Sequence, residues 1–191
     1  MAHVSIIGTG NMGEAISSVI TKGGNTVEMF GKADADKPAT GDIVVLAIPY
    51  SAVDDVIAQR GDQLRGKIVV DITNPVNFET FDSLAVPADS SATAVISAKL
   101  PGSRVLKAFN TTFAGTLAAG TVGPLTTTVL VAGDDADAKA TLIDVVSRGG
   151  LKAVDAGGLK RARELEALGF LQISLASSEK VPWTGGFGVV A

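Results

Sequence analysis

The chain has 191 residues, 46% of them hydrophobic, which fits one globular domain or one domain with a small appendage. Its 16 basic and 20 acidic residues form no basic block, so no nucleic-acid partner is expected. Cysteine is absent and His3 is the only histidine, which excludes disulfides, thiolate nucleophiles and cysteine- or histidine-rich metal centres. Because no apolar run has the roughly 18–20 residues of a membrane helix and no signal peptide is recognisable, we expect a cytoplasmic protein without a membrane partner.

The first thirty residues predict a strand, a glycine loop, a helix and a second strand. Residues 4–7 are apolar and lead directly into the sequence Gly-Thr-Gly-Asn-Met-Gly at 8–13. From Met12 to Ile20 the apolar side chains recur at the spacing of one helix face, and residues 26–30 predict the next strand. This context makes the glycine pattern indicative of a dinucleotide site, although a purely structural glycine turn is the alternative.

The three glycines of this loop have separate predicted roles. Gly8 permits a tight turn, Gly10 lets a pyrophosphate approach the backbone, and Gly13 lets the helix pack closely on the strand. The start of the helix then offers unpaired N–H groups and the positive end of its dipole to the phosphates.

The end of the second strand indicates which dinucleotide is bound. NAD sites usually place a carboxylate there for the ribose 2′-hydroxyl, whereas this chain has Gly31 and Lys32, with Asp34 the first acid beyond them. Lys32, with Lys37 further on, is suited to a 2′-phosphate, so we favour NADP over NAD. The alternative is that Lys32 is an ordinary solvated loop residue.

The rest of the chain continues the alternation of strands and helices, which predicts an α/β fold of Rossmann type with a doubly wound, mainly parallel sheet. Further strands are expected at 43–48, 67–71, 104–109, 127–132 and 151–155, and helices after a Ser51 cap, at 91–100, from Gly133–Asp135 to Arg148, and at 160–176. Only eleven residues, 32–42, join the second and third strands, too few for a normal crossover helix.

The C-terminal part is expected to form a small helical segment. We divide the chain into a dinucleotide-binding domain at 1–158 and a C-terminal helix and tail at 159–191. The second half of that helix is apolar almost all round, which predicts burial, either on the same domain or against a second subunit.

Two further strand ends are candidate walls of the site. In open parallel sheets the ligand lies beyond the carboxyl ends of the strands. Pro49 and Tyr50 follow the third strand, and Thr73, Asn74 and Pro75 follow the fourth, so we expect them near the nicotinamide and its ribose. Ordinary proline turns are the alternative.

Several segments together resemble one family. They are residues 8–13, 47–49, 131–135, 155–157 and 163–166, and the chain that contains them resembles the NADPH-dependent reductases of the deazaflavin coenzyme F-420, also written F420, along nearly its whole length. It is also similar to the reductase domain of membrane ferric reductases. The chain departs from the family in a shorter second crossover and in having Gly31-Lys32 where a Ser-Arg pair is usual.

The resemblance implies an NADP-dependent oxidoreductase that is commonly a homodimer. It implies that NADP is held by the glycine loop and the tip of the second strand, and that main chain after the third strand lies near the nicotinamide ribose. The deazaflavin, or a flavin, would stack on the nicotinamide in a cleft facing the C-terminal segment. The residues at the matching positions are Thr9, Asn11, Met12, Gly31, Lys32, Ala47, Ile48 and Pro49.

Hydride transfer between two stacked rings needs little side-chain chemistry, so no catalytic residue is assigned. Lys107, Tyr50 and Asp155 are possible proton donors, but a strand position, a pocket edge and a strand end explain them better. Two other functions stay open: an imine reductase similar to pyrroline-carboxylate reductase, and a non-catalytic NADP-sensing module.

Overall fold

A seven-stranded sheet forms the centre of the computed structural model, which describes residues 1–190. Its strand order is β2-β1-β3-β4-β5-β8-β9, and every neighbouring pair is parallel except β5 with β8. The strands are β1 (His3–Ile7), β2 (Thr26–Phe30), β3 (Ile43–Leu46), β4 (Ile68–Asp71), β5 (Arg104–Lys107), β8 (Thr128–Gly133) and β9 (Lys152–Gly157). The predicted doubly wound, mainly parallel sheet is therefore confirmed.

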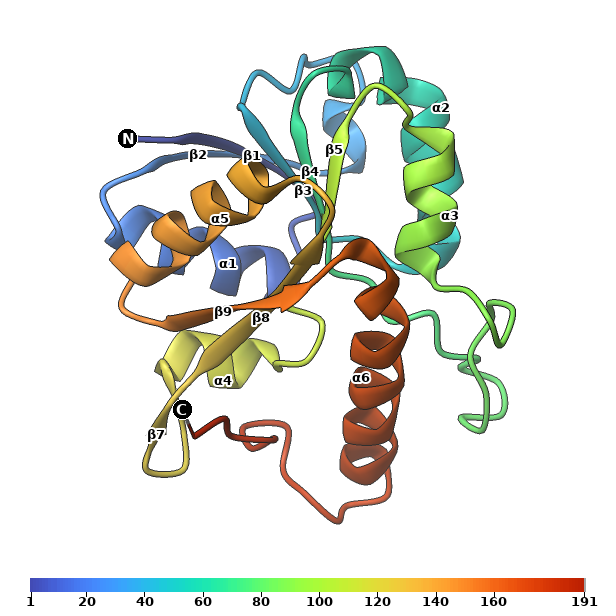
Figure 1. Cartoon of the computed structure of the whole chain (residues 1–191), viewed down its shortest axis with the longest axis vertical. Helices are drawn as coiled ribbons and strands as arrows, with labels where there is room; N and C mark the ends of the chain where they lie inside the picture. Colours follow the sequence, from blue (N-terminus) through green and yellow to red (C-terminus); the bar gives the residue numbers. More distant parts are fainter. Residues whose placement is uncertain (191) are drawn as a thin grey trace.

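Helices cover both faces of this sheet (Figure 1). Helices α1, α4 and α5 pack on one face, and α2 and α3 pack on the other. Their bounds are α1 (Asn11–Lys22), α2 (Val53–Leu64), α3 (Ala92–Lys99), α4 (Ala114–Ala119), α5 (Ala136–Arg148) and α6 (Ala162–Ser177). Three short 3₁₀ turns, η1 (Lys32–Asp34), η2 (Tyr50–Ala52) and η3 (Leu159–Arg161), and a small hairpin of β6 (Thr121–Val122) and β7 (Leu125–Thr126) complete the elements.

The core explains why the inner strands are continuous apolar runs. Val45 and Val70 point into the cluster that contains α1 and α5, whereas Val44 and Val69 point into the cluster that contains α2 and α3. Successive side chains of a strand point to opposite faces, and here both faces are covered, so apolar residues are favoured at most positions. The buried polar exceptions on these strands include Ser5, Asp71 and Lys107.

Most of the local predictions agree with the structure, and one helix start does not. Ser91 and Asp135 cap α3 and α5 by accepting hydrogen bonds from the backbone N–H three residues on. Ser51, in contrast, lies inside η2, and α2 begins at Val53 without a side-chain cap. The turn replaces the predicted cap because the Ala52 N–H donates to the Pro49 carbonyl.

The connection from β2 to β3 is short, as predicted, and contains only the 3₁₀ turn η1. Helix α4 and the β6–β7 hairpin were not predicted. None of the helices in residues 1–190 is both long enough and apolar enough to cross a membrane.

Helix α6 lies with one face against its own chain. Glu166, Gly169 and Gln172 are buried against the chain, whereas Leu171 is 50% exposed. The buried face of α6 thus carries Leu165 together with Glu166 and Gln172, and burial of Leu171 against a second subunit stays a prediction. The division of the chain at residue 158 stays a prediction.

Candidate functional site

The glycine loop packs directly on the end of β3. Gly8 has a φ of +120°, and a Cβ on it would lie 2.0 Å from the carbonyl oxygen of Ala47. A Cβ on Gly13 would lie 2.3 Å from the carbonyl oxygen of Gly8. Both positions therefore require glycine for packing within the protein, which agrees with the tight turn and the close helix contact expected there.

Gly10 differs from its two neighbours because it faces open space. It is the N-cap of α1 in an extended conformation, and a Cβ on it would meet no atom within 4 Å. No side chain caps the helix. The first N–H groups of α1 are thus available to an external acceptor, and the helix dipole favours an anion at this point.

A cleft of about 570 Å³ opens beside this loop, between the ends of β1, β2 and β3 and the side of α2. The predicted residues that line it are Gly8, Thr9, Gly10, Gly31, Lys32, Ala47, Ile48 and Pro49. Ile7, Phe30, Ala35, Ala52, Asp55, Val56, Gln59 and Arg60 complete the lining. The chain leaves β1 toward β2 and returns past β1 to β3, so the cleft lies at the point where the strand order reverses.

The other predicted residues lie outside the lining of this cleft. Asn11, Met12 and Gly13 form the first turn of α1 directly behind the loop. Tyr50 begins η2, and its pKa is raised, first of all by burial, so the phenol is a weaker acid than usual. Thr73 and Pro75 are buried, and Asn74 is partly buried.

The tip of β2 carries a carboxylate, contrary to the prediction. Asp34 Oδ2 accepts a hydrogen bond of 2.9 Å from the Gly31 N–H, and Lys37 Nζ lies 2.7 Å from Asp34 Oδ1. The hydrogen bond from Lys37, followed by that from Gly31, lowers the pKa of Asp34. The prediction failed because η1 folds the chain back by one turn and returns residue 34 to the strand end.

The wall formed by Thr73, Asn74 and Pro75 is tied to the next strand and to α6. Asn74 Nδ2 donates to the Asn110 carbonyl at 2.8 Å, and Asn110 Nδ2 donates back to Asn74 Oδ1 at 2.9 Å. Asn110 Nδ2 also lies 2.8 Å from the Leu165 carbonyl oxygen on α6. These bonds fix the strand tips where a nicotinamide is expected.

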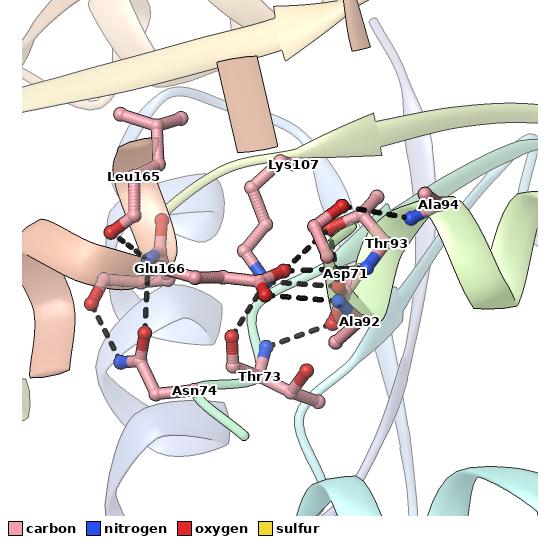
Figure 2. Close-up of polar contacts among 11 residues, drawn as sticks. Asp71, Thr73, Asn74, Ala92, Thr93, Ala94, Lys107, Leu165 and Glu166 are labelled. Carbon is pink, nitrogen blue, oxygen red and sulfur yellow. Dashed lines mark hydrogen bonds and ion pairs between the residues drawn. The ribbon is translucent and has the colours of Figure 1, made fainter. Parts of the chain in front are cut away.

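A buried ionic cluster lies next to this wall (Figure 2). Lys107 Nζ is 2.9 Å from Asp71 Oδ2 and 2.9 Å from Glu166 Oε1, and all three side chains are at most 1% exposed. Lys107 also donates to the Thr73 carbonyl at 2.6 Å. We refer to Lys107, Asp71 and Glu166 as the buried triad.

Glu166 joins α6 to the start of α3. Its carboxylate accepts from the Ala92 N–H at 2.9 Å and from the Thr93 N–H at 3.3 Å, as Figure 2 shows. Thr93 Oγ1 adds a bond of 2.7 Å to Asp71 Oδ2. A carboxylate at a helix N-terminus satisfies unpaired N–H groups and the helix dipole, so the triad connects β4, β5, α3 and α6.

Two of the possible proton donors are engaged within the protein. Lys107 is fully buried in the triad. Asp155 lies on the edge strand β9, and its pKa is lowered, first by the hydrogen bond from Lys139 and then by that from the Gly157 N–H, so it is held ionised. The absence of a catalytic side chain stays a prediction.

Sequence reasoning missed Arg60, which lines the cleft, and the partners of Lys107. A lysine among apolar residues in a buried strand was the one available signal for the triad, because a buried cation requires a partner. For Arg60 the sequence held no signal, since it lies on an otherwise polar stretch of α2.

A strand, glycine loop and helix with a cleft at the strand-order reversal define a dinucleotide-binding protein of Rossmann type. The family model "NADP oxidoreductase, coenzyme F420-dependent" matches residues 25–75. The F420-dependent NADP reductase of Methanocaldococcus jannaschii is 31% identical over 171 residues, which span 87% of this chain and 76% of that protein. The chain belongs to the family of F420-dependent NADP oxidoreductases.

Two other similarities agree with this assignment. The metalloreductase STEAP3 of Rattus norvegicus is 34% identical over 126 residues, 66% of this chain and 24% of that protein, which confirms the predicted relation to ferric reductases. A solved structure from Arthrobacter sp. FB24, described as a candidate F420-dependent NADP reductase, covers 100% of both chains with a TM-score of 0.87 and 23% identity. This last likeness confirms the fold.

Proposed function

We propose that this protein is an NADP(H)-dependent oxidoreductase that transfers a hydride to or from F420 or a flavin-like acceptor. The observation that carries the proposal is the uncapped start of α1 at Gly10, which opens into the cleft with no protein atom where a Cβ would stand. Such a cradle of backbone N–H groups suits a pyrophosphate. Family membership supplies the reaction class.

The chain's own residues bind and orient in this proposal. Backbone N–H groups of the loop at 8–13 hold the pyrophosphate, and Gly31 and Lys32 hold the adenosine end. Ala47, Ile48, Pro49 and Tyr50 border the nicotinamide ribose, with Thr73, Asn74 and Pro75 as the opposite wall. The nicotinamide supplies the hydride when it is bound, and the protein contributes distance, angle and exclusion of water.

The first test is a titration of the purified protein with NADPH and NADH, followed by NADPH oxidation with F420, FMN, FAD and a cyclic imine. We expect tighter binding of NADPH and turnover with F420 or a flavin. Binding without turnover on any acceptor supports the NADP-sensing module instead, and turnover with the imine alone supports an imine reductase. Failure to bind either dinucleotide contradicts the proposal.

We also propose that the protein is a homodimer. Leu171 on α6 is 50% exposed. Trp183 in the C-terminal tail is 53% exposed, although its ring packs on that of Phe113 with 4.9 Å between the ring centroids. Large apolar side chains exposed in this way are typical of subunit contacts. Sedimentation equilibrium at micromolar concentration should give twice the chain mass, and the mass of one chain would contradict the proposal.

A further inference from the structure

Arg60 is a buried cation on α2 that lines the same cleft as the glycine loop. It is 3% exposed, and its guanidinium carbon lies 5.0 Å from the ring centroid of Phe30 at the end of β2. Nη1 donates to the Lys37 carbonyl at 2.6 Å, and Nη2 donates to the Asp34 carbonyl. Helix α2 thereby holds the light-blue 3₁₀ turn that follows β2 (Figure 1).

Arg60 forms no ion pair within residues 1–190. Its charge acts on the Asp34 carboxylate from a longer distance and adds to the lowering of the pKa of that group, after the hydrogen bonds from Lys37 and Gly31. Among residues 1–190, no carboxylate oxygen lies within 4.0 Å of its guanidinium nitrogens. Its remaining acceptor is the neutral Gln63 Oε1 at 3.3 Å. Asp55 also lines the cleft, but its side chain is exposed to solvent. Because a buried cation that is hydrogen-bonded only to neutral acceptors is incompletely compensated, an anion that enters the cleft gains free energy from Arg60.

The groups at the tip of β2 nearly cancel one another in charge. Lys37 is occupied by Asp34, whose carboxylate sits on the Gly31 N–H. That arrangement leaves only the exposed Lys32 to attract a 2′-phosphate, next to a carboxylate of the kind that NAD sites use for the 2′-hydroxyl. A further positive charge on the cleft therefore favours NADP over NAD.

We propose that Arg60 is a specificity-determining residue, which supplies from α2 the positive charge that selects the 2′-phosphate of NADP over the 2′-hydroxyl of NAD. This inference rests on the proposed function. Arginine has five N–H donors, and three hydrogen bonds to protein acceptors leave donors free for a phosphate.

The test is the ratio of the dissociation constants for NADH and NADPH, measured by nucleotide fluorescence titration of the full chain. In Arg60→Met we expect this ratio to fall by roughly tenfold or more, because the loss of a hydrogen bond to a charged group changes a dissociation constant by about one power of ten. Arg60→Lys should retain most of the ratio because it keeps the charge. Arg148→Met, an exposed arginine on α5, is the matched control and should leave the ratio unchanged.

The outcomes separate this inference from the proposed function. A ratio in Arg60→Met within about threefold of the wild-type value overturns the inference. A residue that only holds the turn η1 in place would weaken the binding of NADH and NADPH equally. If that variant does not fold, Arg60→Gln, which keeps donors for the two carbonyls without the charge, is judged by the same ratio. If the wild-type protein binds neither nucleotide, the proposed function fails as well.

Discussion

Replacing Lys107 by methionine is expected to lower the free energy of unfolding by about 3–5 kcal/mol, because it leaves the carboxylates of Asp71 and Glu166 buried without their cation. Methionine is close to lysine in length, so the loss reflects the charge more than a cavity. The Thr73 carbonyl also loses its donor. Urea unfolding followed by circular dichroism measures the change.

A matched control separates this effect from the loss of any ion pair. Lys99 pairs with Asp54 on the surface, where the two side chains are 41% and 72% exposed. Lys99→Met should therefore change the stability by less than about 1 kcal/mol. A Lys107→Met protein as stable as Lys99→Met would show that the triad does not anchor the fold.

A double-mutant cycle measures how strongly Lys107 on β5 is coupled to Glu166 on α6. Glu166 carries the contact between α6 and the start of α3, so Lys107→Met and Glu166→Gln should not be additive. We expect a coupling of roughly 0.5–3 kcal/mol, the range for residues in one ionic network. Additive changes would mean that the two residues act independently.

The sheet could be predicted from the sequence because each strand shows its environment locally. The apolar runs around Val44 and Val69 mark strands covered on both faces. The six residues of α4 and the two-residue strands of the β6–β7 hairpin are too short to establish a period. The antiparallel direction of β8 could not be predicted either, because an apolar run shows the same pattern in a parallel and in an antiparallel strand.

In the candidate site, too, the features formed by neighbouring residues could be predicted, and those formed by residues far apart in sequence could not. The glycine loop is contiguous in sequence, and the roles predicted for Gly8 and Gly13 agree with the packing, whereas the role of Gly10 toward a pyrophosphate stays a prediction. The triad joins residues 36 and 59 positions apart, and Arg60 reaches a carbonyl 26 positions away. Only the sheet topology brings such residues together, so spacing along the chain carries no sign of them.

A bulky residue at position 10 is expected to abolish dinucleotide binding while the fold survives. Gly10 has a φ of −81°, which any residue adopts, and a Cβ there would meet no protein atom within 4 Å. In Gly10→Leu the side chain would stand between the N–H groups of α1 and the pyrophosphate. We expect NADPH to bind at least about 100-fold more weakly, with the stability changed by less than about 1 kcal/mol.

A substitution at Gly8, in the same loop, is expected to lower the stability of the fold. Gly8→Ala places a Cβ against the Ala47 backbone at a φ of +120°, so it should lose more than about 1 kcal/mol of stability. Nucleotide titration and thermal unfolding of both variants distinguish a ligand-facing glycine from a packing glycine. Undiminished binding by Gly10→Leu would contradict the assignment of the loop as the pyrophosphate site, whatever the behaviour of Gly8→Ala.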